Sequence, residues 1–86
     1  MFLEESDKKY FKEVGYTNKD INQIERAVAV TDFEVDDKPM DLVSVLRIMD
    51  RKEFLSGMGR SAFHWTAMRT AVDGRKVYFD SSKLFK

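Results

Sequence analysis

The side chains best suited to chemistry lie in the last third of this sequence, where basic and aromatic residues are interspersed. Arginine and lysine neutralise phosphates, and exposed aromatic rings stack on nucleobases. The candidate contacts to nucleic acid or to a partner are Arg60, His64, Trp65, Arg69, Arg75 and Lys76. The competing interpretation makes the aromatic rings core and the cations an ordinary solvated face. The motifs of RNA-recognition and cold-shock domains are absent, so no particular nucleic-acid-binding module is indicated.

His64 is the single histidine and therefore the natural candidate for acid–base catalysis near neutral pH. No serine with the spacing of a nucleophile elbow accompanies it, and we expect it to pack between Phe63 and Trp65. One histidine without any cysteine also excludes the usual zinc ligand sets. We therefore expect no enzyme, no catalytic residue, no metal and no cofactor.

Two further stretches resemble ligand sites in composition only. The acidic residues 32–37 fail the calcium-loop pattern, because Asp37 stands where the loop needs glycine and Val43 where it needs glutamate. The stretch is better explained as the solvated face of a strand. Residues 57–61 contain two glycines but match neither phosphate-binding fingerprint, so they predict a flexible connection. The alternative is a helix that begins at Ser61 and offers its amides to a phosphate.

The charge of the chain is divided between its two parts. Residues 1–50 carry twelve acidic and seven basic side chains, and residues 51–86 carry eight basic and three acidic ones. The formal net charge of zero therefore hides a dipolar chain. The basic part could attract a polyanion, an acidic partner, or the acidic part of a second copy in a homodimer.

Length and composition predict a single globular domain, residues 1–86. With 35% charged and 43% hydrophobic residues, the chain is typical of a folded protein. The absence of cysteine and of a secretory signal favours a cytoplasmic location. No apolar run is long enough to span a membrane.

Apolar periodicity and capping residues predict up to four helices. The expected ranges are about 3–14, 18–30, 42–49 and 51–56. Thr17 and Asp20 have the spacing of a capping box for the second helix, and Asp50 can cap the fourth. Gly57 is expected to stop the fourth helix.

Alternation of apolar and polar residues predicts a strand over about 31–35. A polar turn follows, in which Pro39 is expected to end the ladder.

The Asp73-Gly74 pair predicts a C-terminal β-hairpin of about 62–71 with 75–81. A helix over 61–70 is the alternative, since the segment also contains good helix formers. The expected fold class is α+β, with three to four helices, one short strand and the hairpin.

The order helix, strand, two helices and hairpin resembles that of a winged helix. The resemblance is topological and implies a recognition helix that would enter a nucleic-acid groove. The helix at 51–56 is short for that role, whereas a helix over 61–70 would turn Arg60, His64 and Arg69 outward. We therefore expect a small non-catalytic binding or regulatory module that contacts nucleic acid through its C-terminal segment. The alternatives are a protein–protein adaptor or homodimer and, third, an enzyme that uses His64.

Overall fold

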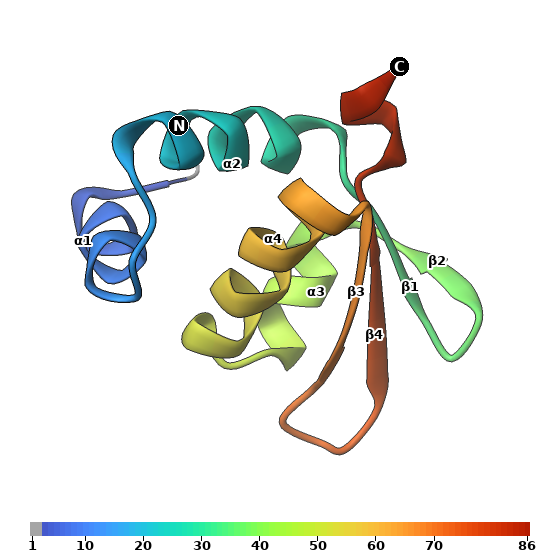
Figure 1. Cartoon of the computed structure of the whole chain (residues 1–86). Coiled ribbons are helices and arrows are strands. Elements are labelled where there is room, and N and C mark those ends of the chain that lie inside the picture. Colours follow the sequence, from blue (N-terminus) through green and yellow to red (C-terminus); the bar gives the residue numbers. More distant parts are fainter. Residues whose placement is uncertain (1–2) are drawn as a thin grey trace.

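Helices cover one face of a four-stranded antiparallel sheet in the computed structural model, which describes residues 3–86 (Figure 1). The elements in chain order are α1 (Glu5–Glu13), α2 (Asn18–Val30), β1 (Asp32–Val35), β2 (Lys38–Met40), α3 (Leu42–Ile48), α4 (Arg51–His64), β3 (Thr66–Thr70), β4 (Lys76–Asp80) and the short 3-10 helix η1 (Ser82–Phe85). The expected α+β class is confirmed, as are the first strand and the C-terminal hairpin.

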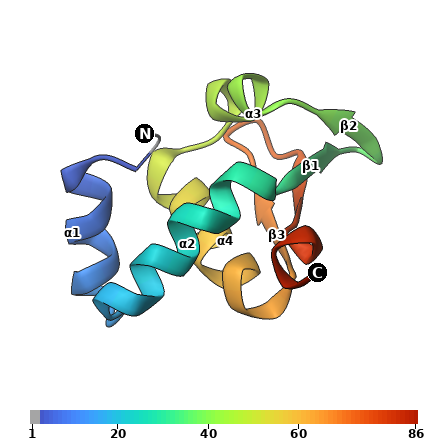
Figure 2. The same ribbon diagram turned by 90° about the horizontal axis from the view of Figure 1, so that it is seen from above.

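The strand order β2-β1-β4-β3 places β1 beside β4, although more than forty residues separate them in the chain. In this pairing Phe33 lies opposite Phe79, and both side chains point into the core. Both α3 and α4 belong to the connection between these strands, and α4 packs on β3 and β4. Figure 2 shows α1 beside the start of α2, and η1 near the end of α2.

The strand β2 was not expected, because Pro39 was taken to end the ladder. Asp36 and Asp37 adopt left-handed φ angles of 52° and 64° and form a two-residue hairpin turn. Pro39 lies opposite Glu34 in the second pair of this hairpin. Antiparallel pairs alternate between bonded and non-bonded, so the proline nitrogen points to the open edge, where no donor is required.

The helix α4 does not stop at Gly57 but continues to His64, so residues 57–61 are not a flexible connection. The alternative helix over 61–70 is also wrong, because α4 ends at His64 and its C-cap Trp65 has a left-handed φ of 70°. The first strand of the hairpin, β3, therefore begins at Thr66 and not near residue 62. The expected cap is confirmed, since the Asp50 carboxylate accepts from the amides of Lys52 at 3.1 Å and Glu53 at 3.3 Å.

Both glycines of α4 lie where an aromatic ring approaches the helix backbone. A Cβ atom on Gly57 would lie 2.5 Å from Cζ of Phe79, and one on Gly59 would lie 3.0 Å from the hydroxyl oxygen of Tyr16. Glycine lowers helix propensity by only about 1 kcal/mol, which the packing of these rings offsets. In this chain the glycines therefore serve close packing inside a helix and do not break it.

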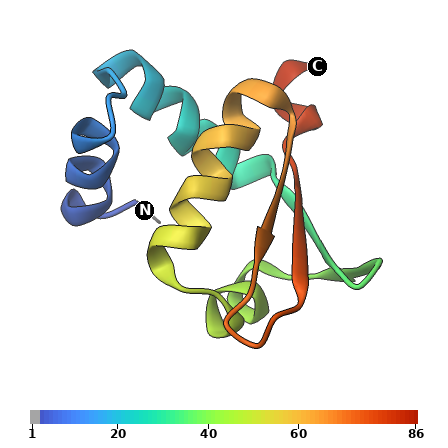
Figure 3. The same ribbon diagram turned by 60° about the horizontal axis from the view of Figure 1, so that its bottom comes forward.

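Figure 3 shows α4 lying along the strands of the C-terminal hairpin. Three buried phenylalanines, one each from α4, β1 and β4, form the centre of the core. The ring centroids of Phe33, Phe54 and Phe79 lie 5.3–5.9 Å apart, within the range of favourable aromatic contacts. Of the helices, α4 contributes the most buried residues, because it lies between α2 and the sheet. That position leaves α4 a narrow solvent-facing stripe.

Candidate nucleic-acid interface

The solvent-facing stripe of α4 carries polar and cationic side chains at helical spacing. Lys52, Arg60 and His64 are exposed, and Ser56 and Phe63 are half-buried between them. Positions three and four apart share one face of a helix, so these side chains form a continuous row. The opposite face is buried against α2 and the sheet.

Three of the six candidate residues line one groove at this stripe. Arg60 and His64 from α4 and Arg69 from β3 line a groove of about 430 Å³ together with Tyr10, Tyr16 and Phe63. We call these six residues the cationic groove. The helix α1 and the turn after it form one wall of the groove. Two of its three aromatic residues, Tyr10 and Tyr16, therefore come from the acidic N-terminal part of the chain.

Ring packing holds the aromatic wall of the cationic groove in place. The rings of Tyr16 and Phe63 are stacked, with centroids 5.8 Å apart and planes 10° from parallel. Phe11 lies behind them, edge-on to Tyr16 at 5.5 Å and to Tyr10 at 5.6 Å. Because Phe11 is fully buried, the two tyrosines are anchored to the core and present a preformed surface.

The two arginines of the groove differ in how firmly they are held. Arg69 donates from Nε to the Ser56 hydroxyl at 3.2 Å, and the same nitrogen lies 3.6 Å from a carboxylate oxygen of Glu53. Arg60 forms no ion pair with any residue among 3–86. The guanidinium of Arg60 is therefore the free positive charge of the groove.

The other three candidates lie elsewhere. Trp65 is 55% exposed, and its ring packs on Phe85 at 5.6 Å, at the end of α4 and outside the groove. Trp65 thus does not belong to the core. Its orientation follows from the left-handed cap that turns the chain from α4 into β3.

Arg75 and Lys76 lie at the tip of the β3–β4 hairpin and are already bonded there. Arg75 donates from Nε to the Asp73 carboxylate at 2.8 Å, a bond that lowers the pKa of Asp73. Lys76 donates to the Thr70 hydroxyl at 2.9 Å.

The tip of the hairpin is docked beside the start of α4. The amide of Val72 donates to the carbonyl of Ile48 at 2.9 Å, two residues before the Asp50 cap. A five-residue strand spans about 17 Å, so the hairpin cations and Trp65 lie at opposite ends of α4. Lys76 lies on the face of the sheet away from α4, beside Glu34, Asp36 and Asp37. The six candidate residues therefore do not form a single patch.

Tyr10 and Tyr16 line the groove although neither was among the six candidate residues. No local pattern joins them to Arg60, which lies more than forty residues away. Only the packing of α1 and its turn against α4 brings them together.

No family model, curated protein or solved structure matches the chain. Among residues 3–86, no group of three or more His, Asp or Glu side chains is placed to hold a metal ion. Within the same residues, no helix has the length and apolar character to cross a membrane.

Proposed function

We propose that this protein is a non-catalytic binding module that contacts nucleic acid through α4 and the hairpin that follows it. The chain order α2, β1, α3, α4, β3, β4 and the strand order β1-β4-β3 support a winged-helix-like arrangement. In that arrangement α4 takes the part of the recognition helix, and the tip of the β3–β4 hairpin takes the part of the wing.

The observation that carries the proposal is the exposed Arg60, which forms no ion pair among the described residues and lies in the same groove as His64 and Arg69. An unpaired guanidinium on a helix stripe is suited to a phosphate oxygen, which it can meet with two parallel hydrogen bonds. Lys52 lies two turns earlier on the same stripe and can meet a second phosphate. Such binding is electrostatic and therefore weakens steeply with salt.

The test uses a short fluorescein-labelled DNA duplex and its single strand, titrated with the protein at about 50 and about 200 mM salt. Fluorescence anisotropy gives the dissociation constant. We expect binding that weakens with salt, and we expect Arg60→Ala to lower the affinity about 5-fold or more and the salt slope by about 0.9. Arg26→Ala is the matched control, because Arg26 is an exposed arginine on α2 outside the groove.

Two results contradict the proposal. One is the absence of binding to both DNA forms at the lower salt concentration. The other is equal loss in Arg60→Ala and Arg26→Ala, which indicates diffuse attraction by net charge. Tighter binding to the single strand than to the duplex contradicts only the winged-helix-like geometry, because stacking on the aromatic wall then dominates.

We further propose that the protein acts without catalysis and in the cytoplasm. The first part is supported by His64, which is exposed and has no hydrogen-bond partner among residues 3–86 to orient its ring. The second is supported by the absence of cysteine from the sequence. The alternative function, a protein–protein adaptor, gains support from a different surface.

A further inference from the structure

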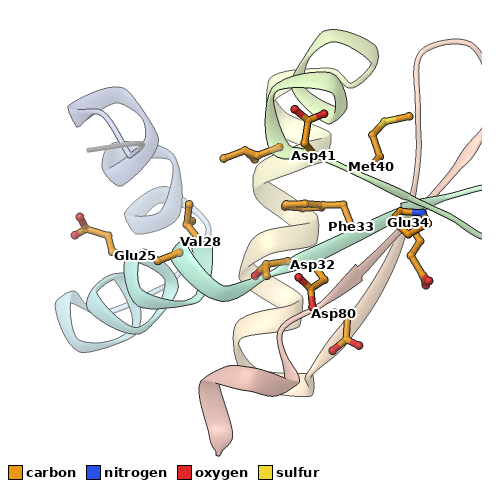
Figure 4. A pocket seen from close by; sticks show the side chains of 12 residues that line it. Glu25, Val28, Asp32, Phe33, Glu34, Met40, Asp41 and Asp80 are labelled. Atoms are coloured by element: carbon orange, nitrogen blue, oxygen red, sulfur yellow. The ribbon is translucent and has the colours of Figure 1, made fainter.

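A second groove, of about 860 Å³, lies between the end of α2, the β1–β2 hairpin and the start of α3 (Figure 4). Its floor is apolar and comes from four elements: Val28 of α2, Phe33 of β1, Met40 of β2 and Leu42 of α3. Phe33 is buried, whereas the other three are half-buried and partly accessible from the groove. Partly accessible apolar side chains from several elements can accept an apolar group of a partner.

The rim of this groove is acidic. Its five carboxylates are Glu25, Asp32, Glu34, Asp41 and Asp80, and no lysine or arginine among the described residues lines it. Figure 4 shows Asp41 and Asp80 on opposite sides of Phe33, with Glu25 and Glu34 further out. We call these five carboxylates and the four floor residues the acidic groove.

Three of the rim carboxylates lack a cationic partner. Asp32 is paired with Lys83 at 3.1 Å, and Glu25 is 3.8 Å from Lys8. Glu34, Asp41 and Asp80 form no ion pair with any residue among 3–86. The amide of Ser82 donates to Asp80 at 2.9 Å and lowers its pKa, so this carboxylate is charged at neutral pH. Lys83 and Lys86 act on Asp80, and Arg47 on Asp41, only from beyond ion-pair distance. The groove therefore carries five carboxylates, of which three have no direct ion pair with another described residue.

We propose that the acidic groove binds a cationic amphipathic segment of a partner protein, with an apolar side chain on the floor and lysine or arginine at the rim. The charge of the rim is complementary to such a segment and is distributed over α2, β1, β4 and the α3 cap. A single small cation could meet only one part of this rim. A ligand that offers charge alone would leave the apolar floor uncovered.

A second copy of the chain is the competing occupant. Its Arg75 is already paired with Asp73, and its Arg60 is the cation that we assign to nucleic acid. The cationic and acidic grooves share no lining residue. The present proposal is therefore independent of the proposed contact with nucleic acid.

The test is a selection of random dodecapeptides displayed on phage, with the whole chain immobilised as the target. We expect the enriched sequences to combine lysine or arginine with leucine or an aromatic residue. The best one is then synthesised and titrated by fluorescence anisotropy against the protein and its variants. A matched peptide, in which serine replaces each apolar residue, measures the contribution of the floor.

The decisive variant is Glu34→Lys, which reverses one unpaired rim charge on the surface of β1. We expect it to weaken the selected peptide about tenfold, since attraction becomes repulsion. Glu13→Lys is the control, because it makes the same charge change at an exposed position of α1, outside the groove. The serine-substituted peptide is also expected to lose about tenfold or more.

Four outcomes contradict the proposal. They are the absence of enriched peptides, enrichment without net positive charge, equal binding to Glu34→Lys and Glu13→Lys, and equal binding of the serine-substituted peptide. Analytical ultracentrifugation of the protein alone, which measures self-association, provides a fifth outcome. Self-association that is abolished by Glu34→Lys but not by Glu13→Lys assigns the groove to a second copy and overturns the partner-protein assignment.

Discussion

The ring of Phe79 lies directly against the backbone of α4 at Gly57, so close that a Cβ atom there would be 2.5 Å from the ring carbon Cζ. This contact joins the central strand β4 to the middle of α4. Phe79 is fully buried and has Phe33 and Phe54 as aromatic neighbours, so its ring has no free space into which to move. The spacing between helix and sheet therefore depends on glycine at position 57.

Gly57→Ala is expected to destabilise the protein by about 2–3 kcal/mol or more, because the methyl group overpacks the core. The gain in helix propensity, about 1 kcal/mol, cannot offset this overlap. Urea unfolding followed by circular dichroism measures the difference.

The control is Gly59→Ala, in the same helix and with the same propensity gain. A Cβ atom there meets Tyr16 and Phe11 at 3.0–3.3 Å, which requires these rings to move by only a few tenths of an ångström. We expect stability within about 1 kcal/mol of the parent. Equal effects of the two substitutions would contradict the close contact at Gly57.

A buried carboxylate connects α1 to the start of α4. Asp7, whose side chain is 4% exposed, accepts from the amide of Glu4 at 3.1 Å and from the guanidinium of Arg51, through Nε at 3.3 Å and also through Nη2. Arg51→Ala leaves this carboxylate buried without its cation, so we expect a loss of about 2–3 kcal/mol. Urea unfolding of the parent and of Arg51→Ala measures this loss in the free energy of unfolding.

The exposed pair of Lys83 and Asp32 is the comparison for that prediction. Both of its side chains are 59% exposed, and solvent screens the attraction. Lys83→Ala is therefore expected to change the free energy of unfolding by less than about 1 kcal/mol. A loss as large as that of Arg51→Ala would show that burial does not distinguish the two pairs.

Buried hydroxyl groups connect the ends of α2, α4 and β4. The Ser81 hydroxyl donates to Ser61 at 3.0 Å and lies 2.6 Å from the hydroxyl of Thr31. Ser81→Ala removes both contacts, and we expect a loss of about 1–2 kcal/mol in urea unfolding. Ser82→Ala, at the half-buried next position, removes a hydroxyl bond to the Asp80 carboxylate near the surface, so we expect a smaller loss of less than about 1 kcal/mol. A larger loss there than at Ser81 would count against the hydroxyl network.

The carboxylate of Asp80 makes a pH-dependent contribution to stability. The amide of Ser82 bonds to it and lowers its pKa below the ordinary value of 3.8. A lowered folded-state pKa stabilises the fold above the unfolded-state pKa, and this stabilisation is lost as the pH falls through the folded-state value. The side chain is near the surface, so the contribution is less than about 1 kcal/mol.

The variant Asp80→Asn retains the acceptor oxygen and removes the charge. We expect it to be slightly less stable than the parent near pH 7, with a difference that disappears below the lowered pKa of Asp80. Urea unfolding of both proteins across this pH range measures the difference directly. A difference that persists at the acid end would mean that the charge of Asp80 is not its cause.

Features that depend on neighbouring residues were predictable from the sequence. Thr17 and Asp20 form the expected capping box, with Thr17 accepting at 3.2 Å and Asp20 accepting at 2.9 Å. Gly15 ends α1 with the positive φ that glycine adopts freely, and Gly74 has a positive φ in the expected hairpin turn. The α+β class follows from such local signals, because periodicity and caps act within a few residues of the chain.

Other features depend on contacts between segments that are distant in the chain, and only the tertiary structure decided them. Whether Gly57 breaks a helix depends on the ring of Phe79, and whether Pro39 ends a strand depends on its position at an open edge. The same holds for both grooves: Tyr10 meets Arg60 only through packing, and the acidic rim draws residues from four elements. A sequence states the chemistry of each side chain, but which side chains share a surface is set by how the elements pack against one core.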